Sequence, residues 1–110
     1  MKEGPQPITV TFVDGAHTID GSEPTGLVFG RGAELDVDSN PFMHRQVGRF
    51  VAVGDTWWVE NLSSWSPLWL TADGTTSLVG CTERAPLCAV NSVVSFEAGS
   101  CRYELGVHQP

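Results

Sequence analysis

The sequence predicts an all-β domain, an antiparallel β-sandwich of about eleven short strands. Apolar and polar residues alternate in several segments, as they do in strands with one buried face. Turn signals separate these segments, among them Asp14-Gly15, Gly54-Asp55 and Asp73-Gly74. No stretch keeps a period of about 3.6 residues long enough to indicate an amphipathic helix.

The N-terminal half begins with residues 1–7, a flexible lead-in rich in proline and glycine. Residues 8–13 alternate as a half-buried strand, and the Asp14-Gly15 turn returns the chain antiparallel to it. Residues 27–30 are entirely apolar, which indicates burial on both faces. The strands expected in this half are residues 8–13, 16–20, 27–30, 35–37, 46–53 and 56–61.

The C-terminal half continues the same pattern. Its expected strands are residues 68–71, 77–81, 87–90, 93–98 and 101–107. Residues 82–86 have the composition of a loop, and residues 108–110 form a short tail, so a single domain spans residues 8–107. Side chains expected to be mostly buried are those of Phe12, Val28, Val51, Trp58, Leu78, Phe96 and Tyr103.

The composition excludes several classes of protein. A length of 110 residues with 41% apolar residues suits one folded domain with its own core. No apolar run approaches the ~18 residues of a membrane span, and the N-terminus lacks the apolar core of a signal peptide. We therefore expect a cytoplasmic protein without a membrane partner. A net charge of −7 argues against nucleic-acid binding, which depends on clustered basic residues.

The chain has three cysteines, Cys81, Cys88 and Cys101. An odd number without a signal peptide favours reduced thiols, although a bridge between Cys81 and Cys88 stays open. Their spacing matches no metal or redox motif, and no fourth ligand is evident nearby. We expect neither a metal nor another cofactor.

Arginines concentrate in one part of this acidic chain. Arg31, Arg45 and Arg49 all fall within residues 29–70, although the whole chain has only six basic residues. One interpretation is an anion-binding site formed by neighbouring loops. The other is that these arginines neutralise nearby carboxylates. The carboxylates in question are those of Glu34, Asp36 and Asp38.

The order of motifs in residues 29–70 resembles that of forkhead-associated (FHA) domains. Phe29-Gly30-Arg31 matches the family's hydrophobic-Gly-Arg motif in full. Residues 44–47 take the place of its Ser-Arg-x-His motif, with Arg45 retained. A strand-like segment and Trp57-Trp58 then lead to residues 61–67, in the place of Asp-x-x-Ser-x-Asn-Gly. The resemblance implies an eleven-stranded sandwich that binds phosphothreonine peptides.

The resemblance also implies a peptide site on three loops, at residues 31–34, 38–45 and 62–68. In the family, the arginine that follows the glycine contacts the phosphate, and Arg31 matches it. Arg45 is retained, and His44 stands where the family has a phosphate-binding serine. Histidine can donate a hydrogen bond and carries charge when protonated. Ser64 matches the loop serine, whereas Ser66-Pro67 replaces the family's Asn-Gly.

Three functions compete at this point. The first is a module that binds a phosphothreonine peptide through Arg31, His44, Arg45, Ser64 and Ser66. The second is a degenerate FHA-like module that makes phosphate-independent protein contacts through Trp65 and Trp69, because exposed tryptophans often mark interfaces. The third is an enzyme that uses His44 with Ser63 or Ser64, but no nucleophile motif such as Gly-x-Ser-x-Gly is present. We expect a protein or phosphopeptide partner and no catalysis.

Overall fold

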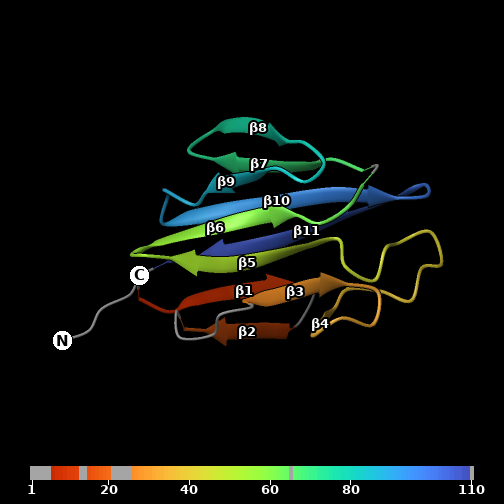
Figure 1. The fold of residues 1–110 in the computed structure, drawn as a ribbon, viewed down its shortest axis with the longest axis horizontal. Helices are drawn as coiled ribbons and strands as arrows, with labels where there is room; N and C mark the ends of the chain where they lie inside the picture. The colour runs from red at the N-terminus through yellow and green to blue at the C-terminus, as the bar shows by residue number, and fades with distance from the viewer. Residues whose placement is uncertain (1–5, 13–14, 21–25, 65, 110) are drawn as a thin grey trace.

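The computed structural model describes residues 6–12, 15–20, 26–64 and 66–109. Within these ranges every regular element is a strand, and the strands form two sheets packed face to face (Figure 1). The all-β sandwich predicted from the sequence is therefore confirmed. The same ranges hold no helix with the length and apolar character needed to cross a membrane.

The two sheets are named sheet A and sheet B. Sheet A has the strand order β2-β1-β11-β10-β7-β8, and sheet B has the order β4-β3-β5-β6-β9. The pairs are antiparallel except β3 with β4, which is parallel and two residues long. The strands are β1 (Ile8–Phe12), β2 (Gly15–Ile19), β3 (Leu27–Gly30), β4 (Leu35–Asp36), β5 (Gly48–Val53), β6 (Thr56–Asn61), β7 (Leu68–Ala72), β8 (Thr75–Val79), β9 (Arg84–Pro86), β10 (Asn91–Ala98) and β11 (Cys101–His108).

Several loops lie together at one end of the sandwich. In Figure 1, β1 begins and β11 ends at the left of the view. The β3–β4 turn, the β4–β5 loop and the β10–β11 turn lie at the right. The strands of the two sheets thus present one set of connections together, at the end away from the start of β1.

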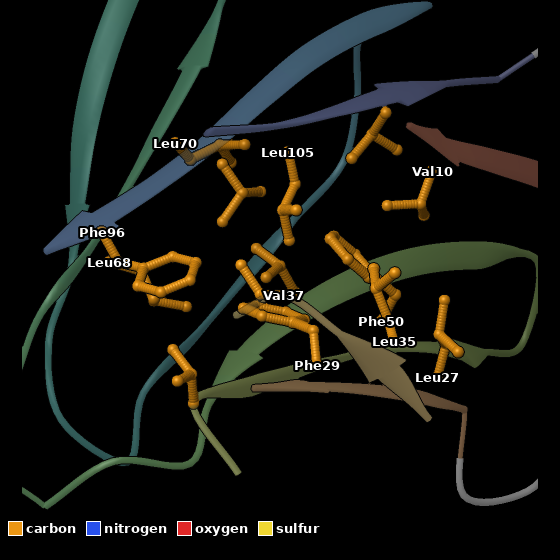
Figure 2. Close-up of a cluster of buried hydrophobic side chains, with 14 of the residues drawn as sticks. Val10, Leu27, Phe29, Leu35, Val37, Phe50, Leu68, Leu70, Phe96 and Leu105 are labelled. Carbon is orange, nitrogen blue, oxygen red and sulfur yellow. The ribbon is translucent and has the colours of Figure 1, made fainter. Parts of the chain in front are cut away.

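The core lies between the sheets and is built by strand alternation. Phe29 and Phe50 from sheet B point toward sheet A, with ring centroids 5.1 Å apart (Figure 2). The Phe96 ring from sheet A lies 5.8 Å from that of Phe29. Leu105 and Val10 extend the cluster along sheet A, and both are fully buried. Aromatic contacts between the two sheets stabilise the fold by more than the apolar area they bury, so this cluster holds the sheets together.

One predicted strand is wrong, and one strand was missed. Residues 87–90 bury Leu87 and Ala89 alternately, as a strand does, but form no strand. Their carbonyls accept hydrogen bonds from the Gln109 side chain, at 2.7 Å for Leu87 and 2.9 Å for Ala89, so no strand partner is needed. Conversely, residues 84–86 pair with β6 despite Pro86. They form the edge of sheet B, where a missing N–H costs little.

Some of the side chains predicted to be buried are buried, and others are not. Val51 and Phe96 are buried as expected, whereas Phe12, Val28 and Tyr103 are only half-buried. Leu78 is 63% exposed, because the pairing of Leu68 with Val79 turns Val79 inward and Leu78 outward. The prediction of a buried Trp58 is also wrong, since the alternation of β6 buries its neighbour Trp57 instead.

Replacing Trp57 and Trp58 in turn tests this assignment of faces. Trp57 is 1% exposed, and its Nε1–H donates to the Gln6 carbonyl at 2.8 Å. Trp57→Ala should lower the free energy of unfolding by about 3–5 kcal/mol. Trp58 lies half-buried under the Arg84 guanidinium, 4.6 Å from its ring centroid, and Trp58→Ala should cost only about 1 kcal/mol. Urea unfolding of both variants measures the difference, and equal losses would contradict the observed register.

Candidate functional site

A groove lies across the loops at one end of the sandwich, with a volume of about 820 Å³. It is bordered by the turn after β3, the β4–β5 loop and the start of the β6–β7 loop. Its lining combines two arginines with several apolar side chains. The described lining residues are Arg31, Pro41, Phe42, Met43, His44, Arg45, Gln46 and Leu62.

The β4–β5 loop crosses the end of β3 in close contact, and Gly30 permits it. Gly30 has a φ of 154°, which disfavours residues with a side chain. A Cβ at this position would lie 2.5 Å from the Arg45 carbonyl oxygen and 2.7 Å from that of His44. Further along, the Val47 N–H donates to the Phe29 carbonyl at 2.9 Å. The loop therefore rests directly on the backbone of β3.

Arg31 is held by two consecutive carbonyls of this loop. Its backbone N–H donates to His44 at 2.9 Å, and its Nε–H donates to the Met43 carbonyl at 3.1 Å. Arg31 lines the groove, and the bond through Nε uses neither of the two terminal amino groups of its guanidinium. A planar, permanently charged donor fixed in this way suits an anion with several oxygens.

Two of the nearby carboxylates, those of Asp36 and Asp38, are engaged in other hydrogen bonds. Asp36 accepts a hydrogen bond from the Gly32 N–H at 2.8 Å, and Asp38 accepts one from the Tyr103 hydroxyl. Among the residues that the structure describes, no ion pair joins a carboxylate to Arg31 or Arg45. Arg49 differs, because its Nε lies 2.6 Å from the Glu60 carboxylate on sheet B. Arg49 is thus neutralised by a carboxylate, that of Glu60, whereas Arg31 and Arg45 have no carboxylate partner within the described residues.

Sheet A forms hydrogen bonds with the other side of the β4–β5 loop. The Asn40 amide donates to the Ala98 carbonyl at 3.0 Å and to the Tyr103 hydroxyl at 3.1 Å. The Tyr103 hydroxyl in turn donates to the Asp38 carboxylate at 2.5 Å. The hydrogen bond from Tyr103 is the main cause that lowers the pKa of Asp38, and a hydrogen bond from the Ser39 N–H is the second. The same bond to the Asp38 carboxylate is the main cause that raises the pKa of Tyr103. The loop is therefore fixed to both sheets.

Asn61 organises the β6–β7 loop from inside. It is 1% exposed, and its side-chain amide donates to the carbonyls of Ser66 and Val79 at 2.8 and 3.1 Å. Its side-chain oxygen accepts the Ser63 N–H at 2.8 Å. The next residue, Leu62, donates its N–H to the Val47 carbonyl at 3.0 Å. The β6–β7 loop is thereby tied to the end of the β4–β5 loop.

The structure gathers some of the predicted site residues and separates others. Arg31, His44 and Arg45 share the groove. His44 is half-buried, with its Nε2 atom inside the protein, and it lines the gap behind the groove together with Ser66. Ser64 is exposed on the β6–β7 loop but is not among the described lining residues.

The two predicted contact tryptophans do not line the groove. Trp69 is half-buried on the outer face of sheet A, because its neighbours Leu68 and Leu70 point into the core. Trp65 lies outside the described residues.

Sequence reasoning did not assign Phe42 or Leu62 to the site. Phe42 is 74% exposed and Leu62 is 37% exposed, and both line the groove. A signal existed for Phe42, because an aromatic residue directly after a proline in a polar loop has no strand to bury it. The role of Asn40 was also missed, since its partners lie 58 and 63 residues further along the chain.

Metal binding and disulfide bonding find little support among the described residues. Within the described ranges, no cluster of three or more histidine, cysteine or acidic side chains is placed to hold a metal ion. Cys81, Cys88 and Cys101 are free thiols, so the bridge between Cys81 and Cys88 considered above is absent.

Comparison with known proteins finds a solved structure with a similar fold. No protein-family model and no curated protein sequence matches this chain. The structure is similar to the crystal structure of Rv1747 FHA-1 from Mycobacterium tuberculosis, with a TM-score of 0.71. The match covers 96% of this chain and 98% of the other, at 15% sequence identity. The chain therefore has an FHA-like fold.

Substituting Gly30 and Gly32 separates close packing from backbone strain. Both glycines have positive φ, but a Cβ at Gly32 would meet nothing within 4 Å. Gly32→Ala should therefore cost only the conformational strain, about 1–2 kcal/mol. Gly30→Ala should cost more, about 3 kcal/mol or above, because it adds a clash with the loop carbonyls. Chemical denaturation measures both, and equal costs would show that the β4–β5 loop can move aside.

The pH dependence of the Asp38–Tyr103 bond provides a second test. Because the folded-state pKa of Asp38 is below its ordinary 3.8, its contribution to stability is present above pH 3.8 and is lost as pH falls through the folded value. The pKa of Tyr103 is raised from 10.0, so its contribution is present below pH 10.0 and is lost as pH rises through the folded value. NMR titration should show the Asp38 midpoint moving up in Tyr103→Phe. An unchanged midpoint would mean that the bond does not form in solution.

Proposed function

We propose that this chain is a protein-interaction module that binds a phosphothreonine-containing peptide in the groove between its loops. The observation that carries the proposal is the pair of groove arginines, Arg31 and Arg45, which have no carboxylate partner among the described residues. An acidic protein that keeps two such charges together has a place for an anion. The FHA-like fold supports the same assignment by analogy.

The two arginines would act differently. Arg31 is half-buried and its Nε is already bound to Met43, so its terminal amino groups are oriented before a ligand arrives. Such a group forms charge-assisted hydrogen bonds to phosphate oxygens with little further loss of entropy. Arg45 is exposed, so its side chain would become ordered only when the ligand binds, and it would add a second positive charge. A phosphothreonine with a charge of about −2 matches this pair.

The remaining predicted residues take supporting roles in the proposal. Ser64 is exposed on the β6–β7 loop, two residues after the groove residue Leu62, and its hydroxyl can donate a hydrogen bond. His44 and Ser66 line the same internal gap, and we assign to them the spacing of the β4–β5 and β6–β7 loops. Ser66 stands where the family has the asparagine that holds the peptide backbone, so that contact is missing, and Pro67 in place of the glycine stiffens the loop. The phosphate contacts then carry a larger share of the affinity.

The cellular setting belongs to the same proposal. Reading phosphothreonine requires a compartment with protein kinases, and the three free thiols suit the reducing cytoplasm. We therefore place the module in the cytoplasm, in a signalling role, with a protein partner.

A second candidate function rests on the outer face of sheet A. Trp69 on β7 lies directly opposite Leu78 on β8, which is 63% exposed. Tryptophan is enriched among the residues that contribute most to protein–protein binding, and the exposed leucine adds apolar surface beside it. This surface would bind without phosphate, independently of the groove.

The decisive experiment measures the affinity of a phosphothreonine peptide library and of its unphosphorylated twin. Binding that requires phosphate supports the groove, and equal binding of both sets would favour the face of Trp69 and Leu78. Arg31→Ala should weaken phosphopeptide binding about tenfold to a hundredfold, and Arg45→Ala somewhat less. Arg102→Ala is the matched control, because Arg102 pairs with Glu104 on sheet A and loses the same charge. If Arg102→Ala weakens binding as much as Arg31→Ala, the effect reflects net charge and the groove is not the site.

A further inference from the structure

Sheet A ends in an exposed strand, β8, at the upper edge of Figure 1. Among the described residues β8 pairs only with β7, and four of its five residues are exposed. A strand at the edge of a sheet presents backbone N–H and C=O groups to any extended segment that approaches it. Proteins usually block such edges with charged residues, proline, a bulge or a very short strand. Residues 75–79 contain no charged residue and no proline.

The other sheet edges differ from β8. In sheet B, β4 has only two residues and ends in Asp36, and β9 has three residues that include Arg84 and Pro86. At the opposite edge of sheet A, β2 is as long as β8. However, none of the exposed large hydrophobic side chains among the described residues lies on β1 or β2. On β8, Leu78 is 63% exposed, so apolar surface and an unblocked backbone edge occur together.

The β7–β8 turn determines which backbone groups of β8 point outward. Asp73 and Gly74 join the paired residues Ala72 and Thr75, and both have positive φ, as a type I′ turn requires. In such a hairpin the pair next to the turn exchanges its backbone hydrogen bonds. The following pairs then alternate between non-hydrogen-bonded and hydrogen-bonded positions.

Thr76 and Leu78 therefore fall at non-hydrogen-bonded positions, with their N–H and C=O groups directed away from β7. The Thr76 hydroxyl lies 2.8 Å from that of Thr71 across the pair, in keeping with the closer side chains of such positions. The edge closes at Gly80, whose N–H donates to the Glu83 carboxylate at 3.0 Å and whose carbonyl accepts the Glu83 N–H at 3.0 Å. We define the β8 edge as the outward backbone groups of Thr76 and Leu78.

Each end of the β8 edge carries a carboxylate. Asp73 is exposed in the turn before β8, and the Glu83 carboxylate is held at Gly80 just beyond it. The sequence has no lysine or arginine between Arg49 and Arg84. An approaching segment with basic residues near both ends would therefore be attracted.

The same charges disfavour a second copy of this chain at the β8 edge. A two-fold antiparallel pairing that uses Thr76 and Leu78 of both copies would be centred on Ser77. It would bring Asp73 of one copy toward Glu83 of the other at each end, and like charges across paired strands are destabilising.

We propose that the β8 edge binds an extended segment of a partner protein by strand addition, so that the segment continues sheet A. The segment has β-branched residues at its centre and lysine or arginine near both ends. One of its side chains packs on Leu78, which Trp69 supports from the other side as its cross-strand neighbour. This binding goes beyond the phosphothreonine groove, whose described lining includes no residue of β8. It gives the phosphate-independent surface of Trp69 and Leu78 a partner of defined chemistry.

The test titrates the natural protein with the peptide Lys-Arg-Val-Thr-Val-Thr-Val-Lys-Arg and follows the backbone amides by NMR. Ser77 and Val79 donate to β7, so their amides should be protected from hydrogen exchange in the free protein. The amides of Thr76 and Leu78 should become protected only when the peptide binds. Replacing the basic residues of the peptide by glutamate should weaken binding about tenfold or more.

A second pair of peptides tests whether the contact uses the main chain. Each carries N-methyl groups on alternate residues, one set for each edge of the extended peptide. N-methylation removes backbone donors and leaves the side chains and charges unchanged. One of the two peptides should lose binding, and the other should retain it. If both bind as well as the parent peptide, the contact is not strand addition and the proposal is overturned.

Thr76→Pro blocks the β8 edge in the protein itself, because it removes an N–H that does not pair with β7. It should weaken binding of the basic peptide about tenfold or more and leave phosphothreonine-peptide binding unchanged. Thr18→Pro is the matched control on β2, since the Thr18 hydroxyl lies 3.2 Å from that of Thr9 across its own pair. It should leave binding of the basic peptide intact. The peptide experiments use the natural protein, so they stand even if a proline variant fails to fold.

Three further outcomes would overturn the proposal. The first is a basic peptide that leaves the β8 amides unperturbed, and the second is an equal loss of binding in Thr18→Pro and Thr76→Pro. The third is protection of the Thr76 and Leu78 amides that grows with protein concentration alone, which would make the occupant a second copy of this chain. None of these outcomes bears on the groove, because phosphothreonine-peptide binding is measured separately and depends on Arg31.

Discussion

The contact on which the functional end of this protein depends is the crossing of the β4–β5 loop over Gly30. The carbonyl groups of His44 and Arg45 occupy the space where any other residue would place a Cβ. The crossing brings these carbonyls and that of Met43 within hydrogen-bonding distance of Arg31. A loop that rested on a side chain instead would lie farther from β3, and the Arg31 guanidinium would lose the bond that orients it. Glycine at this position is thus a requirement of the site as much as of the backbone conformation.

The β4–β5 loop is hydrogen-bonded to β3 near its two ends, where the Val37 N–H donates to the Gly30 carbonyl at 3.0 Å and the Val47 N–H donates to the Phe29 carbonyl at 2.9 Å. A further attachment lies near its middle. Sheet A supplies it through Tyr103 and the carbonyl of Ala98, which together hold Asn40. The two sheets of the sandwich therefore each hold one part of a single loop. The packing of Phe29 against Phe96 between the layers sets the distance between these two attachments. The packing of the core thus bears on the position of the groove, and Met43 belongs to both, since it is buried in the core cluster and lines the groove.

Much of the fold follows from local sequence pattern, and the misses have physical causes. Alternation and glycine turns predict β5 and β6 well, and the short apolar run of residues 27–30 predicts β3. The pattern fails at residues 87–90, where a side chain, Gln109, satisfies the backbone that a strand would otherwise pair. It also fails for adjacent tryptophans, because a shift of one residue exchanges the faces. In the site, Gly30-Arg31 is recognisable from neighbouring residues alone. The Tyr103–Asp38 bond joins residues 65 apart, and no local pattern carries it.

The electrostatics of the whole chain also bear on what the groove can bind. At a distance equal to the 13.0 Å radius of gyration, two unit charges in water repel by about 0.3 kcal/mol, and a Debye length of about 8 Å reduces this to roughly a fifth. The net charge of −7 would therefore oppose a doubly charged phosphate by only about 1 kcal/mol at physiological salt. A guanidinium in contact attracts it by several times as much before desolvation, about 4 kcal/mol per pair of unit charges near a surface. For the phosphate itself, the attraction to a guanidinium in contact thus outweighs the repulsion by the net charge of the protein. Acidic residues elsewhere in a peptide would meet the repulsion without the contact, so the same charge distribution favours a peptide whose only strong anion is its phosphate.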